Sequence, residues 1–292
     1  MERIEESKLA CLCGQLPPPL EEGRHKGQAG RIGIIGGSLE YTGAPYFAGI
    51  SALKVGADLA HVFCTREAAP VIKSYSPELI VHPVLDNTTT ATEAIMWLDR
   101  LHVIVVGPGL GRQENTFNAV TVLIEACRKL QKPLVIDADG LFLLTQKPQL
   151  LNNYPAGVVL TPNAMEYQRL FGNKEFQPDL LKPFGSNSII VRKGREDEIF
   201  NGTKLTVCTV KGSARRCGGQ GDLLSGSIAT FYVWAMAHQD KKMHAMAACY
   251  AACKLTRLCN ANAFAKHGRS MTCTDMIQEI GNVFRNNFEE TK

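Results

Sequence analysis

Short apolar runs alternate with longer periodic stretches along most of the chain. Continuous runs such as Val103–Val106 are typical of strands that are buried on both faces of a parallel sheet. Stretches with apolar residues three and four apart, such as Phe117, Val120 and Ile124, are typical of helices that cover such a sheet. The alternation predicts an α/β fold, in which one mostly parallel sheet lies between two layers of helices.

The boundaries of the expected elements follow from these runs. Strands are predicted over residues 31–35, 59–64, 79–82, 103–106, 134–136, 158–161 and 189–192. Residues 198–200 and 203–210 predict a hairpin that turns at Asn201-Gly202. Helices are predicted over residues 44–55, 67–74, 94–101, 115–130, 242–258 and 275–288, with Asn115 as the cap of the fourth. Residues 86–92 predict a polar loop, and residues 172–186 an irregular segment.

Glycine-rich or polar turns follow the predicted strands. They are Gly36-Gly37-Ser38, Gly107-Pro108-Gly109-Leu110-Gly111, Asp137-Ala138-Asp139-Gly140 and Pro162-Asn163. Because open α/β sheets bind ligands at the carboxyl ends of their strands, we expect these turns to line one cleft. Each turn taken alone is equally typical of a tight connection. Asn163 and Glu166, for example, have the spacing of a capping box at the start of a helix.

The stretch Cys217-Gly218-Gly219-Gln220-Gly221-Asp222 leads directly into an apolar run that predicts a buried helix. Asp222 is therefore expected at or near a helix N-terminus. Glycines in this position let the backbone approach a ligand closely, and the unpaired N–H groups of a first helical turn attract anions. A carboxylate there can take a proton from a hydroxyl group beside a phosphate. The simpler interpretation, a capping residue after a flexible turn, explains the aspartate but not the three glycines.

Composition narrows the function classes. The chain has 292 residues, of which 45% are apolar and 21% charged, with a net charge of +4. These values are ordinary for a soluble domain, and so mild a charge favours a small anionic ligand over nucleic acid. No apolar run is long enough to span a bilayer. The ten cysteines lack the spacing of zinc sites, so free thiols in a reducing compartment are expected.

The N-terminal region carries acidic residues and no secretory signal. We therefore expect a cytoplasmic protein, with a mitochondrial form, as a precursor or another isoform, left open. Pro17-Pro18-Pro19 suggests a boundary. Residues 1–23 are predicted to be a loosely ordered leader, and residues 24–292 a single catalytic domain.

Taken together, the motifs resemble one known family. His25-Lys26-Gly27, the strand-end turns above, Leu160-Thr161-Pro162-Asn163, Lys193-Gly194 and Gly218-Gly219-Gln220-Gly221-Asp222 stand in the order found in ATP-dependent (S)-NAD(P)H-hydrate dehydratases. These enzymes belong to the ribokinase-like superfamily. The resemblance covers about residues 24 to 288 and implies a three-layer αβα sandwich with a mostly parallel central sheet. One departure is the segment between Phe171 and Ser188, which is shorter than the family pattern.

The resemblance also implies a reaction. Such enzymes use ATP and Mg²⁺ to remove water from hydrated NADH or NADPH (NADHX or NADPHX). They phosphorylate the hydrate hydroxyl and then release phosphate, which restores the ring. Asp222 would be the catalytic base. A functional partnership with an NAD(P)H-hydrate epimerase and homo-oligomers are further implications, whereas membranes and nucleic acids are not expected as partners.

Site residues are carried over by motif position. The hydrate would contact Asp222 and also Gly109, Asn163, Ala164, Met165, Glu166, Tyr167, Gln168 and Arg169. ATP would contact Lys193, Gly194, Arg195, Glu196, Asp197, Gly212, Ser213, Ala214, Arg215, Arg216, Cys217, Gly218, Gly219, Gln220 and Gly221. No direct protein ligand to a metal is expected, and Asp137 is a candidate for holding Mg²⁺ through water.

Two other functions stay open at this point. A vitamin or sugar kinase of the same superfamily would share the aspartate and the glycine-rich turn, but would leave the phosphate on its product. A nucleotide-binding protein without catalysis would have no need of a base at Asp222.

Overall fold

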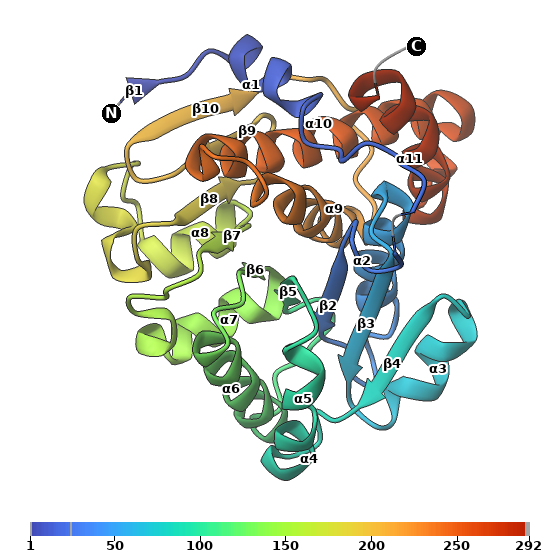
Figure 1. Cartoon of the computed structure of the whole chain (residues 1–292), viewed down its shortest axis with the longest axis vertical. Coiled ribbons are helices and arrows are strands. Elements are labelled where there is room, and N and C mark those ends of the chain that lie inside the picture. Colours follow the sequence, from blue (N-terminus) through green and yellow to red (C-terminus); the bar gives the residue numbers. More distant parts are fainter. Residues whose placement is uncertain (1, 24, 290–292) are drawn as a thin grey trace.

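The computed structural model describes residues 2–23 and 25–289. Met1 of the predicted leader (residues 1–23), and Arg24 and residues 290–292 of the predicted domain (residues 24–292), lie outside the described residues. Its centre is a ten-stranded sheet in the order β1-β10-β9-β8-β7-β6-β5-β2-β3-β4 (Figure 1). Neighbouring strands are parallel except at β9, which is antiparallel to both β8 and β10. The predicted mostly parallel sheet is therefore confirmed.

The strands lie close to their predicted positions. They are β1 (Glu2–Arg3), β2 (Arg31–Ile35), β3 (Leu59–Cys64), β4 (Leu79–Pro83), β5 (Val103–Val106), β6 (Leu134–Ile136), β7 (Val158–Leu160), β8 (Ser188–Arg192), β9 (Asp197–Phe200) and β10 (Lys204–Cys208). Every residue of β5 and β6 is buried, as their continuous apolar runs predict.

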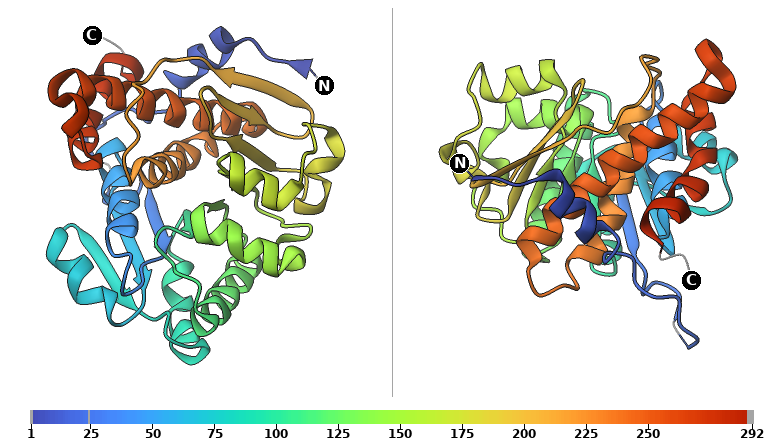
Figure 2. Two further views of the ribbon diagram at one scale, coloured as in Figure 1. Left: turned by 180° about the vertical axis from the view of Figure 1, so that it is seen from behind. Right: turned by 90° about the horizontal axis from the view of Figure 1, so that it is seen from above.

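Helices cover both faces of the sheet, so the predicted three-layer sandwich is confirmed. One face carries α1 (Glu6–Cys13), α2 (Gly43–Val55), α3 (Ala68–Tyr75), α9 (Gln220–Ala235), α10 (Lys241–His267) and α11 (Cys273–Phe288). The other carries α4 (Thr88–Glu93), α5 (Ile95–Leu98), α6 (Glu114–Lys129), α7 (Ala138–Gln146) and α8 (Ala164–Phe171). Figure 2 shows the sheet between these layers in its right-hand view.

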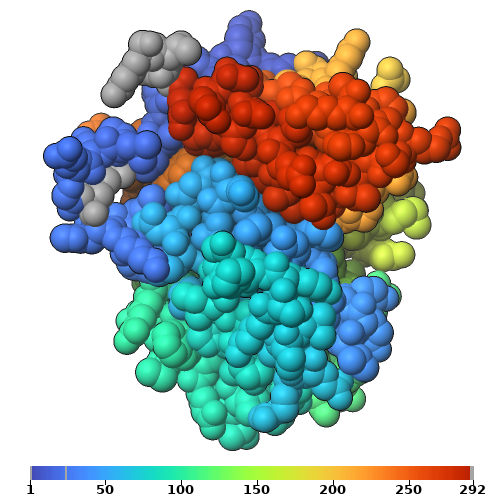
Figure 3. All heavy atoms as spheres, turned by 90° about the vertical axis from the view of Figure 1, so that its right-hand side faces the viewer, coloured from blue at the N-terminus to red at the C-terminus, as the bar shows by residue number. Residues whose placement is uncertain are grey.

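Helix α9 is the most deeply enclosed element near the predicted site. Almost all of its residues from Leu223 to Ala235 are buried, which is typical of a helix inside the core of a large domain. It crosses α2 so closely that a Cβ on Gly226 would overlap the Ala48 carbonyl oxygen. The helix that begins near Asp222 is thus enclosed from Leu223 onward, while its first turn is partly exposed. Helix α11 packs against α2 on the same face of the sheet (Figure 3).

The N-terminal segment corrects one prediction. Residues 2–16 are not a loosely ordered leader, because β1 pairs with β10 and α1 packs on α10. The side chains of Leu9, Cys13 and Leu16 are buried in the core. The prolines at 17–19 follow this packed segment and do not separate it from the domain.

Two local predictions are also wrong. Residues 88–93 form helix α4, which Asn87 caps by accepting a hydrogen bond from the Thr90 N–H, so the expected polar loop is mostly helical. Helix α6 begins at Glu114 after Gln113, which places Asn115 inside the helix. Residues with short polar side chains, such as asparagine, occur both at the N-cap and in the first turn of a helix. The sequence pattern does not distinguish these two positions.

The irregular segment before β8 contains two short 3₁₀ helices, η2 (Pro178–Leu180) and η3 (Lys182–Phe184); two more, η1 (Pro148–Leu151) and η4 (Gly268–Ser270), follow α7 and α10. All ten cysteines are free thiols. Among residues 2–23 and 25–289, no helix is both long and apolar enough to cross a bilayer.

Candidate active site

Asp222 lies in the first turn of α9, as its motif predicts. The helix starts at Gln220, and Gly219 before it has a φ of 92°, a backbone conformation that favours glycine. The first intrahelical bond runs from the Leu223 N–H to the Gly219 carbonyl over 2.9 Å. The N–H groups that precede Leu223 in this turn therefore have no helical partner, and together with the helix dipole they can bind an anion.

A lysine and three carboxylates meet beside this turn. Lys193, just after β8, donates to Asp137 Oδ1 over 2.7 Å, and its Nζ lies 3.9 Å from Glu166 Oε2. Asp137 follows β6 and is fully buried. A Cβ on Gly221 would lie 3.5 Å from Lys193 Nζ, which places the start of α9 directly against the ion pair. The ends of β6, β7 and β8 and the start of α9 thus converge, as the strand-end rule predicts.

The surroundings of Asp222 suit a base. Its side chain is half-buried, and loss of hydration raises the pKa of its carboxyl well above the ordinary value. The negative charge of Asp137 raises this pKa further, and Lys193 partly offsets both effects. A carboxylate with a raised pKa holds an abstracted proton better than an ordinary one, which favours general base catalysis.

Lys193 stays charged in this cluster. Burial lowers the pKa of its ammonium group, but Asp137 and Glu166 outweigh burial, so the net shift is upward. Burial raises the pKa of Glu166, although Lys193 opposes this shift. The site therefore offers one fixed positive charge beside the open N-terminus of α9.

A cleft of about 1100 Å³ opens next to this cluster. It brings together most of the residues predicted for the two substrates. From the hydrate set these are Asn163, Ala164, Met165, Glu166 and Arg169, and from the ATP set Lys193, Gly194, Arg195, Glu196, Asp197, Gly212, Ser213, Ala214, Arg216, Gln220 and Gly221. A smaller pocket of about 100 Å³ adjoins it at Glu166 and Arg169 and is also lined by Arg112 and Asp139.

Other predicted residues do not line this cleft in the described structure: Gly109, Tyr167, Gln168, Arg215, Cys217, Gly218, Gly219 and Asp222 itself. Asp222 adjoins it, since its neighbours Gln220 and Gly221 and its charge partner Lys193 are lining residues.

Three residues that were predicted to contact the hydrate do not line the cleft and have other neighbours. Tyr167 is buried against Phe171 and Phe176. Tyr167 and Gln168 line a pocket of about 670 Å³ that adjoins the cleft and shares Ala164 and residues 193–196 with it. The Gly109 carbonyl accepts hydrogen bonds from the Gly37 N–H and the Ser38 hydroxyl.

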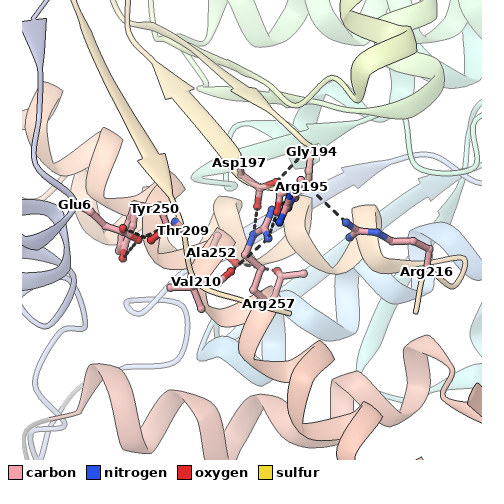
Figure 4. Close-up of polar contacts among 11 residues, drawn as sticks. Glu6, Gly194, Arg195, Asp197, Thr209, Val210, Arg216, Tyr250, Ala252 and Arg257 are labelled. Atoms are coloured by element: carbon pink, nitrogen blue, oxygen red, sulfur yellow. Dashed lines mark hydrogen bonds and ion pairs between the residues drawn. The ribbon is translucent and has the colours of Figure 1, made fainter. Parts of the chain in front are cut away.

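Two residues of α10 that the motifs did not indicate hold the walls of the cleft. Arg257 binds Asp197 Oδ2 over 2.6 Å and donates to the carbonyls of Gly194 and Arg195, as Figure 4 shows. Asn260 accepts from the Ser213 N–H over 2.5 Å and donates to the Arg215 carbonyl over 3.1 Å. These contacts join positions 45 to 63 residues apart, which a local sequence pattern does not reveal.

No group of three His, Cys, Asp or Glu side chains able to hold a metal ion occurs among residues 2–23 and 25–289. The carboxylate of Asp137 that was a candidate for water-mediated Mg²⁺ is instead paired with Lys193.

Comparison with known proteins identifies the family. A model of the NAD(P)H-hydrate dehydratase family matches residues 32–282, most of the chain. The chain belongs to this family. A relative from Aedes aegypti, named ATP-dependent (S)-NAD(P)H-hydrate dehydratase, is 58% identical over 278 residues, covering 94% of this chain and 83% of the relative. A Homo sapiens relative of the same name is 51% identical over 286 residues, covering 93% and 82%.

Solved structures agree on the fold. A ribokinase-like superfamily protein from Enterococcus faecalis superposes with a TM-score of 0.81 at 22% identity, covering 99% of this chain and 97% of that one. The NAD(P)H-hydrate dehydratase of Bacillus subtilis, co-crystallised with ATP and Mg²⁺, has a TM-score of 0.70 at 22% identity, covering 94% and 95%. The ribokinase-like architecture is thereby confirmed.

Proposed function

We propose that this NAD(P)H-hydrate dehydratase removes water from the S-form of NADH hydrate and NADPH hydrate at the expense of ATP, giving NADH or NADPH, ADP and phosphate. Relatives at 51 to 58% identity carry this activity in their names. The observation that carries the proposal is the position of Asp222. Its carboxyl has a raised pKa and adjoins a nucleotide-sized cleft at the N-terminus of a buried helix.

The chemistry requires two steps, because hydroxide is a poor leaving group. Asp222 takes the proton of the hydrate hydroxyl while the hydroxyl oxygen bonds to the γ-phosphorus of ATP and ADP departs. The C–O bond of the resulting phosphate ester then breaks, phosphate leaves, and the ring loses a proton to regain its double bond. Phosphate leaves readily, so ATP is spent to convert the hydroxyl into a better leaving group.

Backbone and lysine charges stabilise the transferred phosphoryl group in this proposal. The N–H groups at the start of α9, which have no helical partner, would bind the γ-phosphate, and Lys193 adds a fixed positive charge beside Gly221. Mg²⁺, where it is bound together with ATP, would neutralise charge on the phosphate groups.

The two substrates occupy different sides of the cleft. ATP lies between the loop at residues 193–197 and the segment at 209–216, which Arg257 and Asn260 hold in place. The hydrate lies along the start of α8, near Asn163, Glu166 and Arg169, and extends toward the adjoining small pocket. This arrangement brings the hydrate hydroxyl and the γ-phosphate together near Asp222.

Our proposal extends to the setting of the enzyme. Because only one epimer of the hydrate is repaired, an NAD(P)H-hydrate epimerase is the functional partner that makes the other epimer available. We propose that the enzyme acts in the cytoplasm, with a mitochondrial form as a second location.

One assay separates the proposal from its alternatives. Hydrated NADH is incubated with the full chain, with and without ATP and Mg²⁺, and products are followed by the absorbance of the reduced nicotinamide ring and by mass spectrometry. A dehydratase restores the absorbance only with ATP and releases ADP and phosphate in equal amounts. Accumulation of a stable phosphorylated product would instead indicate a kinase, and ATP binding without turnover would indicate a non-catalytic binding protein.

A further inference from the structure

The N-terminal segment lies against the last strand before the ATP-binding wall. The Glu2 N–H donates to the Thr203 carbonyl over 3.0 Å, and the Ile4 N–H donates to the Leu205 carbonyl over 2.9 Å. The Thr206 hydroxyl returns a hydrogen bond to the Ile4 carbonyl over 3.1 Å. Because of this pairing, α1 begins beside the C-terminal end of β10, where the wall of the cleft starts.

At this point the carboxylate of Glu6 accepts three hydrogen bonds. Oε1 accepts from the Thr209 N–H over 3.0 Å and from the Tyr250 hydroxyl over 2.8 Å, and Oε2 accepts from the Thr209 hydroxyl over 2.6 Å. Figure 4 shows these contacts. Partial burial raises the pKa of Glu6, but the hydrogen bonds from Thr209 and Tyr250 outweigh it and hold the pKa below its usual value. The group is therefore a carboxylate at neutral pH.

Thr209 is the first residue of the cleft wall that follows β10, and Val210 is the second. The Val210 carbonyl accepts a hydrogen bond from Arg257 over 3.4 Å. The wall is thus held by Glu6 on one side and by Arg257 on the other. Both contacts lead to α10, on which Tyr250 and Arg257 lie two turns apart on the same face.

We propose that Glu6 is a positioning residue for ATP. It touches neither substrate; it holds Thr209 and Val210 so that the segment 209–214 keeps the shape that ATP binds. The inference rests on the proposed use of ATP at this cleft. It also assigns a function to the N-terminal segment: residues 2–16 complete the nucleotide site from outside the matched family region.

The test measures ATP binding directly and compares four variants of the full chain. Glu6→Ala removes all three hydrogen bonds, Glu6→Gln keeps an acceptor oxygen, and Tyr250→Phe removes one donor. Glu5→Gln is the matched control, because the exposed Glu5 side chain contacts the Ser7 hydroxyl at 3.4 Å and not the cleft wall. Calorimetry gives the Kd for ATP, and steady-state kinetics gives kcat and both KM values.

Hydrogen bonds to a charged group are strong enough to predict a rise of about tenfold in the Kd and KM for ATP of Glu6→Ala. Glu6→Gln and Tyr250→Phe are expected to show smaller rises, and Glu5→Gln none. The kcat and the KM for the hydrate should stay within about twofold of the parent, because the reacting groups are untouched. Amide hydrogen exchange should become faster at Thr209 and Val210 in Glu6→Ala.

A second control tests whether a general loss of stability could by itself raise the Kd and KM for ATP. Leu98→Ala, in the buried part of α5 on the opposite face of the sheet, serves as the control that lowers the melting temperature without approaching the cleft. Its ATP affinity should be normal. An ATP affinity of Glu6→Ala equal to the parent's, or an equal loss in Leu98→Ala, would overturn the positioning role. A parent chain that does not bind ATP would instead refute the proposed function, so the two failures are distinguishable.

Discussion

The molecule has two glycine-rich turns at the same edge of the sheet, and they use glycine for opposite reasons. In the turn after β5, a Cβ on Gly107 would overlap the Asp137 carbonyl oxygen, and one on Gly109 would overlap the Tyr41 carbonyl oxygen. Both glycines have positive φ, of 124° and 60°. Protein atoms already fill the space beside this turn, so its glycines permit packing of backbone on backbone.

The turn before α9 is open where the first turn is filled. A Cβ on Gly218 would meet nothing within 4 Å, and one on Gly221 would make ordinary contacts with Lys193 and Asp137 at 3.5 and 3.8 Å. Neither residue has a positive φ. Only Gly219, with a φ of 92° and Cys273 and Phe47 beside it, resembles the packed glycines. The folded protein has space for side chains at positions 218 and 221, so the fold itself does not require glycine there. The space that the two glycines leave open is available to a ligand.

The comparison separates two meanings of one sequence signal. A glycine whose space is occupied by the protein preserves the fold, whereas a glycine that faces open space beside polar groups indicates a binding site. Substitutions by alanine should therefore have opposite consequences in the two turns, on stability in the first and on activity in the second.

The largest effect is expected from Gly107→Ala. The new methyl group must displace backbone of the turn after β6, and alanine is strained at this φ, so unfolding should become easier by about 4 kcal/mol or more. Chemical denaturation followed by circular dichroism would measure the change. A variant as stable as the parent would show that the turn is not filled as described.

A smaller but more specific effect is expected from Gly221→Ala. Alanine favours a helical position by about 0.5 to 1 kcal/mol over glycine, so the variant should be as stable as the parent or slightly more stable. Its methyl group would occupy the approach to the N-terminus of α9, where phosphate is expected, and ATP-dependent turnover should fall at least about tenfold. Thermal unfolding and steady-state kinetics on one preparation provide both values. Full activity would argue against phosphate binding at this turn.

The smallest expected effect concerns stability and pH at Asp222. Because burial and Asp137 raise the pKa of this carboxyl, the folded state prefers its neutral form. The stabilisation from that preference is complete below the ordinary pKa of a carboxyl and is lost as the pH rises through the raised pKa. The asparagine of Asp222→Asn does not titrate. The melting temperature of the variant, relative to that of the parent, should therefore rise as the pH increases. A difference that is constant with pH would contradict the raised pKa.

The sequence predicted the parts of the structure that depend on neighbouring residues. The capping box of Asn163 and Glu166 is present, with both hydrogen bonds formed, because both partners lie within one helical turn. Asp222 is in the first turn of its helix, since an apolar run after a glycine-rich turn determines where that helix starts. Ligand sites in open α/β sheets lie at the carboxyl ends of the strands, and this rule correctly predicted that the segments after β6, β7 and β8 meet. Asp137, Glu166 and Lys193, from these three segments, lie side by side.

Contacts between distant segments could not be predicted in this way. Glu6 and Thr209 are 203 residues apart, and Asp197 and Arg257 are 60 apart, yet both pairs support the cleft wall that we propose to bind ATP. The motif position of Tyr167 predicted contact with the hydrate, but it did not indicate that the ring packs against Phe171 and Phe176. Which face of a helix meets the ligand depends on the packing of the whole layer.

The turnover of Asp222→Asn tests the central claim most directly, because the substitution removes the base and keeps the size of the side chain. Repair of hydrated NADH by the variant and the parent would be measured at saturating ATP, together with the Kd for ATP by calorimetry. We predict that kcat falls by a factor on the order of a hundred or more while the Kd changes little. Turnover close to the parent's would contradict the account, because a cleft that works without this carboxylate does not use it as its base.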